Sequence, residues 1–312
     1  MLNWIVIGIG DIATRRVIPA IQAESRSCLY GLVTRDPAKA APYNTRVWPT
    51  IEAALRDPAI DIVYIASPVF LHGPQTIRSL RAGKHVLCEK PMAMNEPEAR
   101  SMVEAASQND RVLGVAYYRR AYPKVQRAKQ LLDSGVIGKP VLAEINCHEW
   151  RDDTGSHRSW LLDPAQAGGG PLFDIASHRI DVLNFFFGQP LRASGYLSNA
   201  VHHYAVEDNA TVMIDYAEGV RGIMDVRWHS KVKRDECRIR GTEGEMDLTP
   251  LNGPDLVYPG GRESLPNHAN VHGPMIENFT DAVLNGTPLI ASGASSYWTD
   301  WITQQAQQSN QL

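Results

Sequence analysis

The first half of the chain alternates short apolar runs with stretches of helical spacing. Apolar runs at residues 4–7, 29–33, 61–66 and 84–88 have the length of strands, and apolar residues spaced as on a helix follow most of them. Their largely continuous apolar character indicates strands that are buried on both faces. Strands and helices alternating at these lengths predict βαβ units and a parallel sheet.

In the second half, apolar and polar residues alternate instead. Residues 122–132 are expected to form the helix that joins two domains, and residues 141–146 to open a second sheet. Strands are also expected at residues 210–216 and 220–228. One face of the first of these carries only apolar side chains, namely Ala210, Val212, Ile214 and Tyr216. Apolar residues occur on the other faces too, so we expect one sheet face to pack on helices and the other to be covered by something else.

Composition restricts the possible partners. The chain has 312 residues and a net charge of −3, which gives no reason to expect nucleic acid or a membrane surface as a partner. No uncharged apolar run approaches the roughly 20 residues of a membrane span. The chain opens directly on a strand pattern without a basic leader, so we expect a cytoplasmic protein without a signal peptide.

Cysteine and histidine spacing gives no sign of a disulfide framework or a metal site. The four cysteines form no Cys-x-x-Cys pair and lie far apart in the sequence: Cys28, Cys88, Cys147 and Cys237. The ten histidines show no spacing typical of metal ligands. We therefore expect free thiols and no bound metal.

A glycine turn follows the first apolar run. Gly8, Gly10 and Ala13 form the G-x-G-x-x-A version of the dinucleotide-binding fingerprint. Gly8 permits the tight turn, Gly10 lets a pyrophosphate approach the backbone, and Ala13 allows close packing of helix on strand. Asp11 and Ile12 lie at the start of the following helix, where backbone amides are placed to bind phosphates.

The end of the second strand bears on the choice between NAD and NADP. An acidic residue there binds the ribose 2′-hydroxyl, whereas an arginine suits a 2′-phosphate. The chain has Thr34 and Arg35 at this point, and Asp36 is expected to start the next turn. With Thr34 at the ribose position, Arg35 can pair with the phosphate. We therefore favour NADP; a shift of one residue would favour NAD.

Three polar segments follow other strands of the first half. Parallel sheets bind ligands beyond the carboxyl ends of their strands, so these segments are candidates for cofactor and substrate sites. On the cofactor side we expect Ser67, Pro68, His72, Glu89 and Lys90. On the substrate side we expect Tyr118 and Arg119.

A second glycine run, at residues 168–170, allows the backbone to approach a ligand. The helix expected after it carries Asp174 and His178 four residues apart, on one face, as a carboxylate–imidazole pair for proton transfer. The alternatives are a helix-start role for Asp174 and a structural role for His178. Residues 150–166, with Trp160, mix aromatic and polar groups as a sugar or cyclic polyol site would, although a loop of packed tryptophans is the alternative.

At residues 88–91, Cys-Glu-Lys-Pro, the sequence becomes similar to the glucose–fructose oxidoreductase / inositol dehydrogenase / MocA (Gfo/Idh/MocA) family. Residues 8–13, 61–72 and 168–181 carry the same resemblance, which runs over essentially the whole chain. It implies an α/β fold with an N-terminal Rossmann domain and a C-terminal α/β domain with a large, mostly antiparallel open sheet.

The resemblance divides the chain into an NAD(P)-binding domain at residues 1–120 and a substrate-binding and oligomerisation domain at residues 121–312. It implies that Lys90 lies near the nicotinamide and the reacting carbon, that His178 exchanges a proton with the substrate, and that Asp174 binds the substrate. It also implies a homodimer or homotetramer formed through the C-terminal sheet, and it is compatible with a cis peptide at Pro91.

Elementary chemistry agrees with these implied roles. Hydride leaves a carbinol carbon only as the hydroxyl proton departs, and histidine can accept that proton near neutral pH. A lysine cation stabilises the developing alkoxide. We therefore expect an NAD(P)-dependent oxidoreductase acting on a sugar, polyol or related carbonyl compound. A nucleotide-binding sensor without turnover and a nicotinamide-dependent glycosidase remain as alternatives.

Overall fold

A computed structural model describes residues 1–152, 154–156 and 158–310. The chain groups into two compact units, each built from two segments. Unit 1 comprises Met1–Tyr118 and His268–Tyr297, and unit 2 comprises Arg119–Asn267 and Trp298–Leu312. The functional division at residue 120 stays a prediction.

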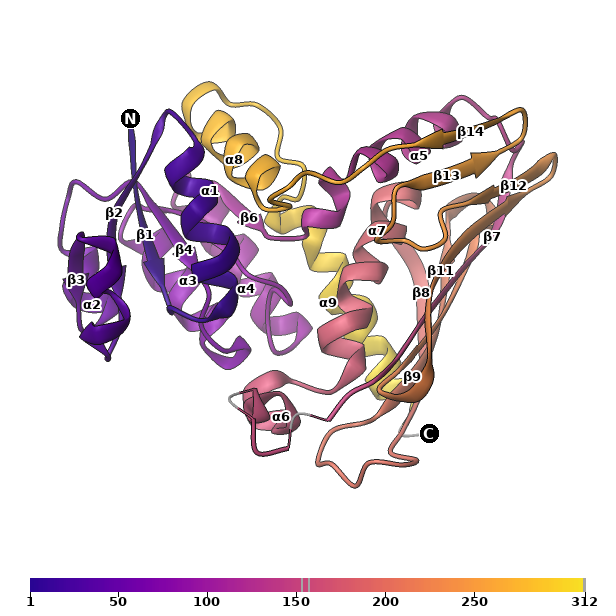
Figure 1. The fold of residues 1–312 in the computed structure, drawn as a ribbon, viewed down its shortest axis with the longest axis horizontal. Helices are drawn as coiled ribbons and strands as arrows, with labels where there is room; N and C mark the ends of the chain where they lie inside the picture. Colours follow the sequence, from indigo (N-terminus) through magenta and orange to yellow (C-terminus); the bar gives the residue numbers. More distant parts are fainter. Residues whose placement is uncertain (153, 157, 311–312) are drawn as a thin grey trace. The chain divides into compact units, whose positions relative to one another are not determined.

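Unit 1 is built on a six-stranded parallel sheet in the order β3-β2-β1-β4-β5-β6 (Figure 1). Its strands are β1 (Leu2–Ile7), β2 (Ser27–Val33), β3 (Arg46–Trp48), β4 (Ile62–Ile65), β5 (His85–Cys88) and β6 (Leu113–Val115). All four residues of β4 are buried, as a strand covered on both faces requires. The strand order reverses between β1 and β4, and doubly wound sheets bind their ligands at such a switch point. The expected Rossmann-type sheet is confirmed.

Helices that connect these strands, and one helix from late in the chain, enclose the core of unit 1. They include a π-helical turn (Ala13–Val17), α1 (Ile18–Ala23), α2 (Ile51–Leu55), α3 (His72–Arg81), α4 (Glu96–Gln108) and α8 (Gly273–Asn285). Figure 1 shows α8, in yellow-orange, beside α1. Phe279 of α8 lies with its ring centroid 5.6 Å from that of Trp4, so a late segment completes the core built on β1.

Unit 2 is built on an eight-stranded sheet in the order β14-β13-β12-β11-β7-β10-β9-β8. Only β7 and β10 pair in parallel among its described strands, so the expected mostly antiparallel sheet is confirmed. The strands are β7 (Pro140–Trp150), β8 (Pro190–Ser198), β9 (Asn209–Tyr216), β10 (Arg221–Arg227), β11 (His229–Gly241), β12 (Gly244–Asp247), β13 (Asp255–Tyr258) and β14 (Gly261–Ser264).

Helices pack closely on one face of this sheet. They are α5 (Pro123–Asp133), α7 (Ser177–Phe187) and the unit 2 part of α9 (Gly293–Ser309); the short helix α6 (Pro164–Ala167) precedes α7 in the chain. A Cβ built on Gly222 would lie 3.0 Å from Leu183 of α7, and one on Gly195 would lie 2.7 Å from Ala306 of α9. Both glycines therefore let helices approach the strands. The predicted alternation in β9 is confirmed, because its apolar face is buried whereas Met213 on the other face is 42% exposed.

All four cysteines are free. No helix in the described part of the chain is both long and apolar enough to cross a membrane.

Candidate functional site

The turn after β1 contains two glycines in different surroundings: Gly8 is tightly packed, and Gly10 is open. Gly8 has φ +88°, and a Cβ on it would lie 2.6 Å from the carbonyl oxygen of Ala66 at the end of β4. Packing within unit 1 therefore requires glycine there. A Cβ on Gly10 would meet no atom of the described residues within 4 Å, and Gly10 has no positive φ. Open space above Gly10, at the switch point of the sheet, fits the pyrophosphate of a dinucleotide.

The helix after this turn begins in a widened form. Residues Ala13–Val17 form a π-helical turn that continues into α1. Ala13 is fully buried, as close packing of this helix on the sheet requires, and Ile12 just before it is 45% exposed. π-Helical turns occur frequently at functional sites. The amides at the start of this helix are placed to bind phosphate groups.

The end of β2 offers an exposed arginine, Arg35, beside an aspartate that caps the next helix. Asp36 accepts a hydrogen bond from the backbone N–H of Ala38 at 3.1 Å and so caps the short helix Pro37–Lys39, as predicted. Thr34 Oγ1 accepts from the backbone N–H of Asp36 at 3.1 Å. Arg35 is exposed beside them. An arginine at this point can pair with a 2′-phosphate, and a carboxylate can bind a 2′-hydroxyl; the turn after β2 contains both kinds of group.

His72, at the start of α3, joins the segments that follow β4 and β5. It is 1% exposed, with Nδ1 2.8 Å from the carbonyl oxygen of Pro91 and Nε2 2.8 Å from that of Ser67. A neutral imidazole donates through only one nitrogen, so both bonds together require the protonated ring. Burial lowers the pKa of His72, against the two carbonyls and Glu89, which raise it. Pro68, next to Ser67, is half-buried.

Glu89 and Lys90 follow β5. The Glu89 carboxylate is buried and accepts from Tyr64 Oη at 2.6 Å and from the backbone N–H of Lys90 at 3.2 Å. Burial raises the pKa of Glu89, but contacts with His272 and Tyr64 and the charge of Lys90 hold it below its usual value. Lys90 is half-buried, and its peptide bond to Pro91 is cis.

The glycines at residues 168–170 of unit 2 are required by close approaches within the chain. A Cβ on Gly168 or Gly169 would lie within 2.5 Å of the Phe173 ring, and one on Gly170 would lie 2.0 Å from the carbonyl oxygen of Glu207. The Glu207 carboxylate also accepts from the backbone N–H of Leu172 at 3.1 Å. Glu207 thus holds the start of the following helix. Sequence reasoning missed it, because it lies far along the chain without a recognisable motif.

The helix that carries Asp174 and His178 differs from the regular α-helix that was expected. Residues Leu172–Ala176 form a π-helical turn containing Asp174, and α7 begins only at Ser177. The Asp174 carboxylate is bound by the guanidinium of Arg151 at the end of β7. His178, in the first turn of α7, is 6% exposed.

Asp181, farther along α7, belongs to a buried ion pair. Its carboxylate is bound by Arg120 through Nε at 2.8 Å and Nη2 at 2.6 Å. Burial raises the pKa of Asp181 to about 6, although Arg120 acts in the opposite direction. This two-point contact assigns Asp181 to the internal packing of unit 2.

Two of the residues expected on the substrate side, Tyr118 and Arg119, are consecutive in the short helix Tyr118–Ala121, where the division between the two units falls. Tyr118 belongs to unit 1, where its ring lies 5.0 Å from that of His272. Arg119 belongs to unit 2, is 7% exposed, and donates from Nε to Asn252 at 3.1 Å. Trp160 is half-buried in a short helix, Ser159–Leu162. Residues 153 and 157 of the expected substrate loop lie outside the described residues.

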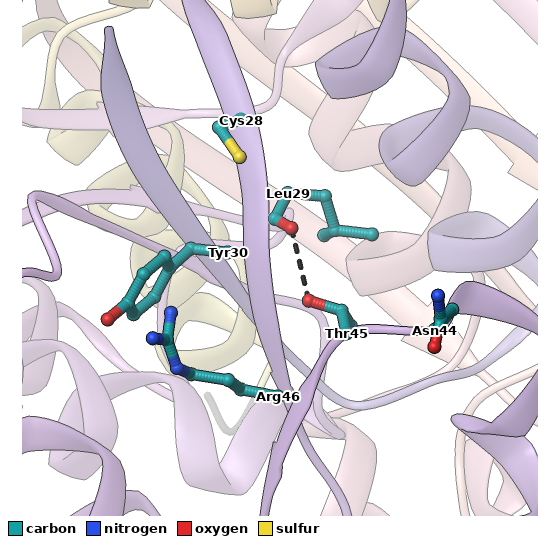
Figure 2. A pocket seen from close by; sticks show the side chains of 6 residues that line it. All are labelled: Cys28, Leu29, Tyr30, Asn44, Thr45 and Arg46. Atoms are coloured by element: carbon teal, nitrogen blue, oxygen red, sulfur yellow. Dashed lines mark hydrogen bonds between the residues drawn. The ribbon is translucent and has the colours of Figure 1, made fainter.

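A hollow of about 490 Å³ lies elsewhere in unit 1, at the starts of β2 and β3. Figure 2 shows the Arg46 guanidinium over the ring of Tyr30, where its Cζ lies 4.0 Å from the ring centroid. The hollow is lined by Cys28, Leu29, Tyr30, Asn44, Thr45 and Arg46. None of the predicted site residues lines it. The opposite ends of these strands lead to Thr34 and the predicted cofactor site.

Comparison with known proteins extends over both units. Residues 2–117 match "Oxidoreductase family, NAD-binding Rossmann fold", and residues 125–247 match "GFO/IDH/MocA C-terminal domain". An oxidoreductase of Formosa agariphila is 31% identical over 289 residues, covering 88% of this chain and 89% of the relative. A 1,5-anhydro-D-fructose reductase of Ensifer adhaerens is 29% identical over 313 residues, covering 96% and 93%.

A solved structure agrees on the fold. The aldose–aldose oxidoreductase of Caulobacter crescentus superposes with a TM-score of 0.89 at 24% identity, covering 99% of this chain and 97% of that one. Together with the parallel sheet and glycine turn of unit 1 and the open sheet of unit 2, these matches establish the relationship. The chain belongs to the Gfo/Idh/MocA family of NAD(P)-dependent oxidoreductases.

Proposed function

We propose that this protein is an NADP(H)-preferring dehydrogenase or reductase that acts on a sugar, a polyol or a related carbonyl compound. The observation that carries the proposal is the glycine turn after β1, at the switch point of the parallel sheet, where Gly10 leaves the backbone open to a ligand, in a chain of this oxidoreductase family. The substrate class is supported by the Ensifer relative, a 1,5-anhydro-D-fructose reductase, whose substrate is an anhydrosugar.

Lys90 and His178 are the groups that we propose for the chemistry. The nicotinamide, when bound, gives or accepts the hydride. Lys90 follows β5 at the ligand-binding end of the sheet, where its ammonium stabilises the negative charge that develops on the substrate oxygen. His178 takes the proton of the substrate hydroxyl during oxidation and returns it during reduction.

The remaining predicted residues are proposed to bind the ligands. Asp174, held by Arg151, presents a fixed carboxylate to substrate hydroxyls. Tyr118, Arg119 and Trp160 supply further substrate contacts. The cofactor contacts are proposed for these residues: Gly8, Gly10, Asp11, Ile12, Thr34, Arg35, Ser67, Pro68, His72, Glu89 and Lys90. Arg35 gives the preference for NADP, because a guanidinium pairs well with a phosphate group.

We also propose that the protein forms a homodimer or homotetramer through the sheet face of unit 2 opposite its helices. Met213 and Ile223 pair across β9 and β10 and are 42% and 36% exposed. Arg227 and His148 bind Asp225 on the same face, so charged groups there are already paired. A face with exposed apolar residues and paired charges suits burial against a second copy.

A panel assay tests the proposed function. The purified protein is offered NADPH or NADP with aldoses, ketoses, polyols and anhydrosugars, and in parallel with a chromogenic glycoside. Steady oxidation or reduction of the nucleotide with one of the sugars or polyols supports the proposal. Release of the aglycone without net nucleotide consumption would indicate a glycosidase. Tight nucleotide binding without turnover of any compound would indicate a sensor.

A further inference from the structure

A buried histidine from late in the chain lies at the carboxyl end of the parallel sheet of unit 1. His272 directly precedes α8 and is 2% exposed. Its Nε2 lies 3.3 Å from Oε1 of Glu89, which follows β5, and its ring lies 5.0 Å from that of Tyr118, which follows β6. His272 therefore contacts the segments after two neighbouring strands.

We propose that His272 is a positioning residue for Lys90 and acts through the carboxylate of Glu89. This inference rests on the proposed function, in which Lys90 is the charged group of the reaction. The contacts form a short chain: Nε2 of His272 faces Oε1 of Glu89, and Oε2 of Glu89 accepts from the backbone N–H of Lys90 at 3.2 Å.

The environment of the Glu89 carboxylate explains why His272 matters. A buried ionised carboxylate must be compensated by hydrogen bonds or opposite charge. The described compensation comes from Tyr64 at 2.6 Å, the backbone N–H of Lys90, the Lys90 charge and His272. Nε2 of His272 lies 3.3 Å from Oε1 of Glu89, and in our proposal this is the ring nitrogen that carries a proton. Removing His272 leaves the carboxylate less compensated and makes its protonation easier.

Both sequence neighbours of Lys90, Glu89 and Pro91, contact buried histidines. Glu89 on one side contacts His272, and Pro91 on the other side faces Nδ1 of His72 at 2.8 Å. Two buried imidazoles, from α3 and from the segment before α8, thus fix the backbone around Lys90. Rigid support of this kind is what a group placed to stabilise charge in a reaction needs.

The pH dependence follows from the groups that face this carboxylate. They are Tyr64 on β4, Lys90 after β5, His72 on α3 and His272 before α8. A carboxylate whose pKa is lowered on folding stabilises the folded protein at pH values above its unfolded pKa. This stabilisation is lost as the pH falls through the folded pKa. Without His272, that loss begins at a higher pH.

The test uses three substitutions in the full-length protein. His272→Phe keeps a ring against Tyr118 and removes the donor, whereas His272→Gln keeps a donor. His268→Ala is the matched control, because His268 is an exposed histidine of the same segment. We measure the pH profile of kcat/KM and the pH dependence of the NADPH dissociation constant. In His272→Phe, we expect the acid limb to move up by about one pH unit, so that kcat/KM falls about tenfold at a pH below both limbs and changes little at pH 7. His272→Gln and His268→Ala should stay within about threefold of the wild type.

Glu89→Gln tests whether His272 acts through the carboxylate of Glu89. Because an amide side chain in place of the Glu89 carboxylate cannot titrate, Glu89→Gln with and without His272→Phe should give the same pH profile. If His272→Phe alone fails to fold, Glu89→Gln alone tests the route: it should abolish the acid limb, and an acid limb that persists would overturn the proposal. An unchanged acid limb in His272→Phe would overturn the proposal, as would a shift that persists in the Glu89→Gln background.

Failure of the proposed function gives a different result. If the wild type turns over no sugar, polyol or carbonyl compound, the proposed reaction is wrong. The His272 proposal is then judged on NADPH binding alone. We expect His272→Phe to weaken NADPH binding about threefold more at pH 4.5 than at pH 8. Equal pH dependence in wild type and variant would contradict it.

Discussion

At the scale of single residues, the two glycines of the first turn separate folding from ligand binding. Gly8→Ala places a Cβ against Ala66 in a backbone conformation that side chains rarely adopt, so it should lower the melting temperature. Gly10→Ala fills only open space, so it should leave the melting temperature unchanged and weaken NADPH binding by about tenfold or more. Calorimetry and fluorescence titration measure the two effects. Normal NADPH affinity in Gly10→Ala would show that the pyrophosphate does not bind next to Gly10.

Arg35 determines the preference between the two nucleotides in our account. Arg35→Ala should weaken NADPH binding about tenfold or more and leave NADH binding nearly unchanged, because only NADPH carries the 2′-phosphate. Arg56→Ala, an exposed arginine of unit 1, is the matched control. Titration of both variants with both nucleotides measures the change. An unchanged ratio of the NADPH and NADH dissociation constants in Arg35→Ala would mean that another group binds the ribose 2′ position.

Lys90 and His178 carry the proposed chemistry. Lys90→Ala and His178→Ala should each lower kcat by about two orders of magnitude or more, because each removes a group that acts on the substrate oxygen in the transition state. Lys39→Ala and His203→Ala change exposed residues and should keep normal kcat. Steady-state kinetics with a substrate from the panel gives the comparison. Near-normal turnover in both Lys90 and His178 variants would exclude them as catalytic groups.

Residue-scale reasoning from sequence succeeded where a local rule applied. The capping role of Asp36 followed from its place before a proline, and the structure confirms it. The run at residues 168–170 was interpreted as an approach to a ligand, whereas the approaches that the structure shows are to Phe173 and Glu207. No sequence spacing indicates that Phe173 or Glu207 contacts these glycines. His272 could not be selected either, since its contact with Glu89 arises from tertiary folding.

At the scale of elements, α8 is the helix whose role depends most on the fold. Phe279→Ala should lower the free energy of unfolding of unit 1 by about 3–5 kcal/mol, because it removes a buried ring from the Trp4 core. Leu284→Ala, on the same helix but 46% exposed, should cost well under about 1 kcal/mol. Denaturant unfolding followed by the fluorescence of Trp4 and other tryptophans measures both. Equal effects would mean that α8 does not contribute to that core.

Strands with a strong pattern were predictable from the sequence, and weakly patterned ones were not. The parallel strands β1, β2, β4 and β5 are continuous apolar runs, and β9 alternates cleanly. Strands β3, β13 and β14 have only three or four residues each and lie at or near sheet edges, so few of their residues show a burial pattern. The π-helical turns before α1 and α7 have no sequence signature that separates them from ordinary helix starts.

At the scale of the whole molecule, the change from continuous to alternating apolar patterns correctly indicated two kinds of sheet. The sequence could not show that residues 268–297 return to unit 1, because a helical pattern does not specify which core its apolar face joins. That return brings α8 to the core and His272 to Glu89. The late segment therefore contributes both to the stability of unit 1 and, in our proposal, to the surroundings of Lys90.

The central claim is that this molecule transfers a hydride between a nicotinamide and a carbon that bears a hydroxyl group. The most direct measurement uses NADPH deuterated at the transferable position of the nicotinamide, with a carbonyl substrate from the panel. We predict that mass spectrometry finds one deuterium on the product carbon that bears the new hydroxyl, and that NADP accumulates in equal amount. Product that forms without deuterium, while the label stays on the nucleotide, would contradict the account.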